Sequence, residues 1–103
     1  MAVVLIAKFT GDVMQLTQAY DEAHRVIMEG GGAPGELRHH CAIGDDALWI
    51  IGVWDSEDLV RTRFASAEFE DVLTSVGFPS PKTAEVTILQ LHAIEPPLDV
   101  ATS

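Results

Sequence analysis

Residues 47–56, ALWIIGVWDS, decide the architecture of this protein. The apolar run from Ala47 to Trp54 is rich in β-branched and aromatic residues, which is typical of a buried strand. The Asp-Ser pair that follows supplies an N-cap for a helix. Because side chains alternate along a strand, Trp49 and Ile51 face one side while Trp54 faces the other. The strand is apolar on both faces, and both faces need a cover.

The sequence on either side predicts five further elements. Apolar residues at three- and four-residue spacing indicate an amphipathic helix that begins near Val13 and stops at the glycines 30–32. The turn residues Gly-Asp-Asp at 44–46 join two strands into a hairpin. The predicted order is a strand over 3–9, the first helix, strands over 37–43 and 47–54, a second helix capped by Asp55 or Ser56, and a last strand over about 84–93.

The second helix carries an irregularity in its apolar pattern. Val60, Phe64 and Ala67 share one face, whereas Phe69 and the apolar residues after it fall on the opposite face of a continuous helix. A straight helix would bury only half of these side chains. We therefore predict a break near residues 65–67, with Ser66 capping a short further helix that ends at Gly77.

The order βαββαβ predicts an α+β, ferredoxin-like domain, in which two helices cover one face of an antiparallel sheet. Such a sheet usually leaves its other face in water, with polar residues there. Here the strand over 3–9 is apolar on both sides too, and exposing those side chains would cost about 1.5–3 kcal/mol each. A second copy is the simplest cover, so we predict a homodimer, a dimeric α/β barrel. Residues 1–95 form the domain, and residues 96–103 are expected to be an extended, partly disordered tail.

Composition limits the possible functions. Sixteen acidic and six basic residues among 103 give a formal charge of −10, which disfavours binding to nucleic acid or anionic membranes. Mean hydropathy is +0.20, high for so short a chain. Cys41, the single cysteine, cannot form an internal disulfide, and the N-terminus lacks a signal-peptide pattern. We therefore expect a cytoplasmic protein.

Several short motifs resemble a known family. VWDS at 53–56, Phe64, SAEF at 66–69 and the closing apolar strand are similar to the antibiotic biosynthesis monooxygenase group of dimeric α/β barrels. PGELRH at 34–39 and LQLH at 89–92 are also similar to small members of that group. The resemblance implies a pocket between sheet and helices, sometimes used for oxygenation without metal or flavin. The family also includes isomerases, haem-degrading enzymes and members without a known reaction.

The haem-degrading branch of that family is not matched. Its pattern pairs a strand-end tryptophan, here Trp54, with a histidine in the second helix and an asparagine in the first strand. The histidine position is Leu73, and the chain contains no asparagine. Without the axial ligand, haem breakdown of that type is disfavoured, and we expect no cofactor.

Candidate substrate-binding residues are the aromatic side chains and one histidine that could line the pocket. Each of them could instead be ordinary core packing. The candidates are Trp54, Tyr20, His24, Trp49 and Phe64.

Two further histidines are candidate catalytic residues. His39 and His92 lie among apolar neighbours in predicted strands, where an imidazole needs a hydrogen-bond partner. Their strands would be opposite edges of one sheet, so we hypothesise that they meet across the dimer as base and polar anchor. The alternatives are that they are structural histidines with satisfied hydrogen bonds, or that they are exposed. His40 must point away from His39, so only His39 and Cys41 share a face, and no metal site is expected.

Two functions remain open on the sequence alone. The first is a cofactor-free monooxygenase, or a related isomerase, that removes an acidic proton from an apolar aromatic or polyketide-like substrate. The second is a ligand-binding or structural homodimer without turnover. The chain carries no nucleotide-binding, nucleophile-elbow or paired-carboxylate motif.

Overall fold

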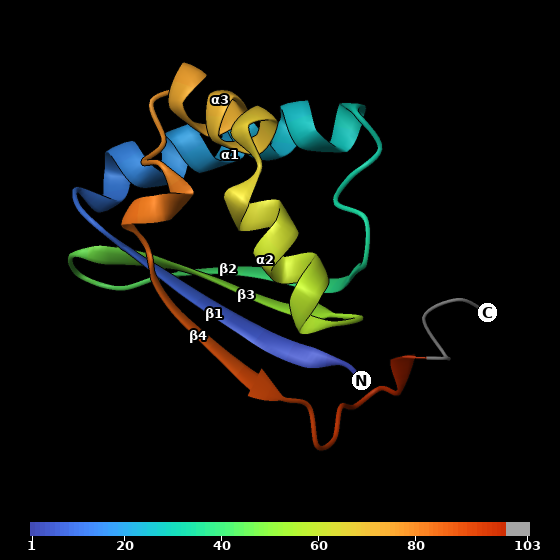
Figure 1. Ribbon diagram of the computed structural model, residues 1–103. Helices are drawn as coiled ribbons and strands as arrows, with labels where there is room; N and C mark the ends of the chain where they lie inside the picture. Colours follow the sequence, from blue (N-terminus) through green and yellow to red (C-terminus); the bar gives the residue numbers. More distant parts are fainter. Residues whose placement is uncertain (99–103) are drawn as a thin grey trace.

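The computed structural model describes residues 1–98 and forms one antiparallel sheet with helices on one face (Figure 1). The strands stand in the order β2-β3-β1-β4, so the predicted ferredoxin-like α+β fold is confirmed. The elements are β1 (Val3–Thr10), α1 (Val13–Glu29), β2 (Glu36–Ile43), β3 (Ala47–Trp54), α2 (Glu57–Ala65), α3 (Ala67–Ser75), the short 3-10 helix η1 (Pro81–Thr83) and β4 (Glu85–Gln90).

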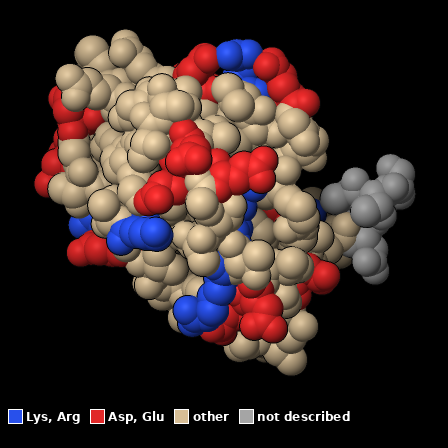
Figure 2. All heavy atoms as spheres, turned by 45° about the horizontal axis from the view of Figure 1, so that its top comes forward, with Lys and Arg blue, Asp and Glu red and all other residues tan. Residues whose placement is uncertain are grey.

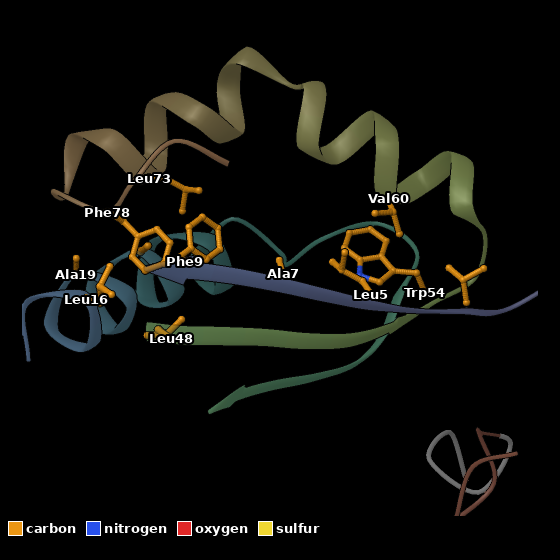
Figure 3. Packing of buried hydrophobic residues seen from close by; sticks show 12 residues of the cluster. Leu5, Ala7, Phe9, Leu16, Ala19, Leu48, Trp54, Val60, Leu73 and Phe78 are labelled. Carbon is orange, nitrogen blue, oxygen red and sulfur yellow. The ribbon is translucent and has the colours of Figure 1, made fainter. Parts of the chain in front are cut away.

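The core lies between the sheet and the helices. At one end Phe9 and Phe78 make an edge-to-face contact with ring centroids 4.8 Å apart, beneath Leu73 (Figure 3). At the other end Trp54 packs beside Leu5 and below Val60 (Figure 3). These side chains are almost wholly removed from water. Burial of such apolar surface supplies most of the stabilisation of a small domain.

The register of the two central strands assigns side chains to the two faces of the sheet. Val3 pairs with Trp54 and Phe9 with Leu48, and all four lie on the helix side. The alternating set from the same strands lies on the face that no helix covers (Figure 1). This open face carries Val4, Ile6, Trp49, Ile51 and, from β4, Leu89. The two central strands thus carry apolar side chains on both faces, as the sequence predicted, while the edge strands add polar residues such as Arg38 and Glu85 to the open face.

The predicted break in the second helix is confirmed. α2 ends at Ala65, and Ser66 leaves the helical conformation with φ −71° and ψ 124°. Its Oγ accepts a hydrogen bond from the amide of Phe69 at 3.2 Å, which caps α3. The change of direction lets both apolar stripes face the sheet, so Val60 and Leu73 are each buried.

The last strand is shorter than predicted. β4 ends at Gln90, which pairs with Val3, and beyond it only the amide of Leu91 bonds to the carbonyl of Ala2, at 3.0 Å. The prediction of a strand to Ala93 is wrong because β1 offers no further partner residues. His92 therefore lies past the strand and is exposed. Arg38 Nη2 donates to the carbonyl oxygen of Pro96 at 3.0 Å. The predicted extended tail covers residues 96–103, of which 99–103 lie outside the described part.

Acidic groups dominate the charged surface, and the few basic groups visible in Figure 2 lie next to acidic ones. Arg25, for example, pairs with Glu22 and Glu29 along α1. Among residues 1–98 no helix is both long enough and apolar enough to cross a bilayer.

The Ser66 cap leads to a stability prediction. Ser66→Ala removes the acceptor for the Phe69 amide and should lower the free energy of unfolding by about 1 kcal/mol, measured by urea denaturation. Ser75→Ala is the matched control, because Ser75 is exposed near the C-terminal end of α3. An equal effect of the two substitutions would contradict the assigned cap.

Candidate functional site

An apolar cavity of about 100 Å³ lies between the helices and the sheet. Most of its wall is aliphatic or aromatic, and its polar groups come from α1, β2, β3 and α2. The lining residues are Tyr20, Ala23, His24, Ile27, Met28, Ala33, Glu36, His39, Ile50, Trp54, Arg63, Phe69, Leu73 and Phe78. An apolar cavity with a few convergent polar groups is the usual form of a small-molecule site.

Three polar side chains on this wall form a hydrogen-bonded chain. Glu36 Oε2 lies 2.9 Å from His39 Nδ1, and His39 Nε2 lies 2.5 Å from the Tyr20 hydroxyl. A carboxylate can only accept, so Nδ1 carries the proton and Nε2 is left as an acceptor for the Tyr20 O–H. Glu36 and His39 are 18% and 28% exposed, so the pair is largely shielded from water. Glu36 thereby fixes the tautomer and orientation of the imidazole.

A β-bulge brings Glu36 and His39 to the same side of the sheet. Residues three apart on a regular strand point to opposite faces. The register shifts between Glu36 and Arg38, so Glu36 pairs with Trp54 while His39 pairs with Gly52, two residues away on the same face of β3. The extra residue is Leu37, which is 42% exposed.

Gly52 provides the room for this arrangement. A Cβ at this position would lie 3.0 Å from Glu36 Oε2 and 3.2 Å from Trp54 Nε1. Both distances are shorter than ordinary van der Waals contact. The glycine therefore lets a carboxylate and an indole approach the same point of the sheet.

His24 completes a cluster of three rings at the cavity wall. Its imidazole lies 5.6 Å from both the Tyr20 and the His39 ring centroids, and the Tyr20 and His39 centroids are 5.9 Å apart. His24 is itself exposed, so it stands at the edge of the cavity. One turn of α1 separates it from Tyr20, which explains how two residues of one helix contact the same ring.

Trp54 closes the inner end of the cavity. The side chain is 2% exposed, and its Nε1 is buried without a hydrogen-bond partner among the described residues. A buried N–H without a partner costs free energy that a ligand acceptor could recover. Trp54 is thus both a core residue and a possible donor to a bound molecule.

Burial changes the acidity of two groups near the cavity. Removal from water raises the pKa of the Tyr20 phenol well above its ordinary value, with smaller contributions from Cys41 and Glu36. Partial removal of the thiol from water also raises the pKa of Cys41, although the residue as a whole is exposed. Tyr20 therefore stays protonated and is a hydrogen-bond donor over the whole physiological range.

A groove of about 350 Å³ lies outside the cavity, between the end of α1 and the junction of α2 and α3. Ile27, Arg63 and Phe69 line both the groove and the cavity, so they stand at the boundary between them. The Arg63 guanidinium lies over the Phe69 ring, 4.1 Å from its centroid. Burial lowers the pKa of Arg63, although the group stays charged.

The sequence-predicted substrate residues divide into two groups. Tyr20, His24 and Trp54 line the cavity. Trp49 does not, because it points to the open face, where Lys8 Nζ lies 5.6 Å from its ring centroid. Phe64 does not either, since it packs against Phe69 with centroids 6.0 Å apart and supports the wall from behind.

The two candidate catalytic histidines are also separated. His39 lies in the cavity, whereas His92 is exposed beyond β4, at the other edge of the sheet. Within one chain they do not meet, as expected from the strand order. His40 is exposed and shares the open face with Ile51.

Sequence reasoning missed Glu36 and Arg63. Glu36 stands three residues before His39, a spacing that argues against contact on a regular strand. Arg63 stands on a short amphipathic helix among solvated charges. The sequence offered a clue only for Glu36. This residue directly follows the turn residues Pro34 and Gly35 at the start of an edge strand, and a β-bulge could be anticipated there because bulges are over-represented at sheet edges.

Within residues 1–98 no three His, Cys, Asp or Glu side chains are arranged to hold a metal ion. Cys41 is exposed and bonds to none of its neighbours among these residues. Leu73, which stands where the pattern of haem-degrading enzymes has a histidine, is buried in the cavity wall.

Comparison with solved structures identifies proteins of the same fold. SnoaB, a cofactor-independent oxygenase from Streptomyces nogalater, superposes with a TM-score of 0.64 at 19% identity, covering 93% of this chain and 98% of SnoaB. The monooxygenase ActVA-Orf6 of Streptomyces coelicolor, in complex with Nanaomycin D, gives 0.63 at 18% identity over 93% and 91%. Rv0793 from Mycobacterium tuberculosis gives 0.63 at 14% identity over 92% and 99%.

No protein-family model and no curated protein sequence matches the chain. The structural likeness is nevertheless strong over nearly the whole length of both partners. The expected resemblance to antibiotic biosynthesis monooxygenases is thus confirmed at the level of the fold.

The state of Tyr20 can be measured directly, because it is the single tyrosine of the chain. Free tyrosine has a pKa near 10.0, so about nine tenths would be ionised at pH 11. We expect the native protein to keep Tyr20 protonated at that pH, followed by phenolate absorbance at 295 nm. The urea-unfolded protein is the control and should titrate normally.

The same shift has a consequence for stability. The unfolded chain would ionise Tyr20 first, so the contribution of this residue to stability is complete below about pH 10 and declines as the pH rises further. A native titration that coincided with the unfolded one would show that the phenol is not held in the cavity wall.

Proposed function

We propose that this protein is a cofactor-independent monooxygenase of the antibiotic biosynthesis type, acting on an apolar, enolisable aromatic or polyketide-like substrate. The observation that carries the proposal is the Glu36–His39–Tyr20 hydrogen-bonded chain on the wall of an apolar cavity. Its fold is shared with SnoaB, which is described as a cofactor-independent oxygenase. Such a reaction needs a positioned base and a water-poor site, and the cavity offers both.

The chain of three residues would act as a proton relay. The Tyr20 oxygen takes a proton from an acidic carbon of the substrate while its own proton passes to His39 Nε2. Glu36 stabilises the resulting imidazolium through Nδ1. A free phenolate never forms, which agrees with the burial that raises the pKa of Tyr20.

Oxygen is the co-reactant of the proposed reaction. The substrate carbanion at a CH₂ group combines with O₂ to give a peroxide anion, which recovers a proton from the relay. Loss of water from the hydroperoxide then leaves a carbonyl, so one oxygen atom enters the product and the other leaves as water. Return of the proton to another atom, without oxygen, would make the same relay an isomerase.

The size of the cavity limits the ligand. About 100 Å³ is less than the roughly 300–1,000 Å³ of common drug-sized sites. We infer that part of a multi-ring substrate stays in the outer groove. Because a nearly filled core leaves little room for a substrate, the same small volume favours a second candidate function, a ligand-binding protein without turnover.

We also propose that the protein is a homodimer that packs through the open face of the sheet. Val4, Ile6 and Ile51 on this face are only partly buried within one chain, and Leu89 is 52% exposed. Covering such side chains contributes about 1.5–3 kcal/mol each.

We further propose a cytoplasmic location. The single cysteine, Cys41, is free, as is usual in the reducing cytoplasm.

The oxygenase proposal can be tested with a two-ring enolisable ketone, 2-tetralone, by following oxygen uptake with an electrode. Wild type should exceed the protein-free rate, and His39→Ala and Tyr20→Phe should each lower the enzymatic rate by about 100-fold, because general base catalysis contributes 10²–10⁴-fold. Uptake that is unchanged in His39→Ala would contradict the relay. A wild type without uptake would favour the binding protein.

His92→Ala is the matched histidine variant. An unchanged rate would mean that Glu36, His39 and Tyr20 suffice within one chain. A loss as large as that of His39→Ala would instead support the arrangement in which His92 of a second copy borders the site. Circular dichroism should show that all variants are folded.

The dimer can be tested by sedimentation velocity at micromolar concentration. Ile51→Glu places a charge at the centre of the open face and should convert the dimer into an 11.1 kDa monomer. Met14→Glu on α1 is the control, since Met14 is 72% exposed and lies away from that face. A wild type that sediments as a monomer would overturn the proposed dimer.

A further inference from the structure

Arg63 differs from the other basic side chains of the chain. The six lysines and arginines include Lys8, Arg25, Arg61 and Lys82, each paired with a glutamate, and Arg38, which bonds to main-chain carbonyls. Only the Arg63 guanidinium forms neither an ion pair nor a hydrogen bond with residues 1–98. In a chain with sixteen acidic residues, an arginine without an acidic partner is unexpected.

The position of Arg63 is as unusual as its lack of a partner. It stands in the last turn of α2, and its side chain lines both the inner cavity and the outer groove. It is half-buried there, so it has lost part of its hydration, and although the charges of Glu36 and Glu68 act on it, neither carboxylate forms an ion pair with it. A ligand that occupied both the groove and the cavity would lie against the three residues that line both, of which Arg63 is the one charged residue.

Packing on Phe69 does not account for this arrangement. The ring lies 4.1 Å from the guanidinium carbon, a cation–π contact that holds the guanidinium in place. That contact involves the guanidinium carbon over the ring, and none of the five N–H donors of the group forms a hydrogen bond with residues 1–98. The contact therefore orients the donors and leaves them free.

The free donors specify the chemistry of a partner. A planar guanidinium binds a carboxylate through two parallel hydrogen bonds, which are stronger than neutral ones. Neither of the two carboxylates whose charge acts on Arg63 is that partner: Glu36 binds His39 through Oε2, and neither Glu36 nor Glu68 forms an ion pair with Arg63. The adjoining wall, with Ile27, Phe69 and Leu73, accepts an apolar body.

We propose that Arg63 is the specificity-determining residue for a ligand with a carboxylate on an apolar ring system, the rings lying in the cavity and the carboxylate at its mouth. This inference rests on one part of the proposed function, namely that the cavity binds a small molecule. It does not require turnover, so it can fail or succeed independently of oxygenase activity.

Two unreactive probes of nearly the same shape separate charge from size. We expect wild type to bind 2-naphthoate about 10- to 100-fold more tightly than the neutral 2-naphthamide in calorimetric titrations, the range that charge-assisted hydrogen bonds give. Arg63→Met keeps the unbranched stem and should abolish this preference, weakening 2-naphthoate binding far more than 2-naphthamide binding. Arg63→Lys should keep part of the preference, because a lysine supplies charge without the bidentate fork.

Arg61→Met is the matched control, because Arg61 lies on the same helix but is exposed and paired with Glu57. It should bind both probes as wild type does. The proposal is overturned if Arg63→Met retains the preference for 2-naphthoate, if wild type prefers the amide, or if wild type binds no 2-naphthoate at millimolar concentration. Binding without any oxygen uptake would support Arg63 and refute only the oxygenase.

Discussion

The pleat of the two central strands is the constraint on which the rest of the structure depends. β1 and β3 carry apolar residues on both sides, apart from Lys8 and Thr10 at the end of β1, and their register places Leu5, Phe9 and Trp54 under the helices. The same alternation sends Ile6 and Ile51 to the open face. A shift of one residue would exchange the two sets. Core, cavity and proposed dimer surface are therefore fixed together by one pairing.

Within that frame, the site is built by small departures from regular structure. A one-residue bulge turns Glu36 toward His39, and a glycine opposite leaves space for the carboxylate. A capped break after α2 turns α3 over the cavity. The bulge lies beside Glu36 and His39, and the helix break follows Arg63 by three residues. The irregular positions of the backbone are therefore close to the polar residues of the cavity.

The cavity combines one hydrogen-bonded carboxylate–imidazole pair with one cation that forms no ion pair within residues 1–98. Glu36 accepts a hydrogen bond from His39, and Tyr20 extends this hydrogen-bond chain to the cavity wall. Arg63 stands apart at the mouth without an acidic partner in the described part of the chain. This division of roles suits a site that moves a proton at one end and holds a charged group at the other. The shared fold of SnoaB and ActVA-Orf6 provides the scaffold, while the residues of this chain define its own polar groups.

The sequence by itself determined the element order, the ferredoxin-like fold, the Ser66 break and the two-sided apolar sheet, because these follow from periodicity and caps that act over a few residues. It also singled out Tyr20, His24, His39 and Trp54, since polar or large aromatic residues in apolar surroundings are unusual. Only the tertiary structure decided that Glu36 meets His39, that Trp49 and Phe64 lie outside the cavity, and that Arg63 stands at its mouth. Those facts depend on a bulge, on strand register and on packing between helices distant in sequence, none of which leaves a local pattern.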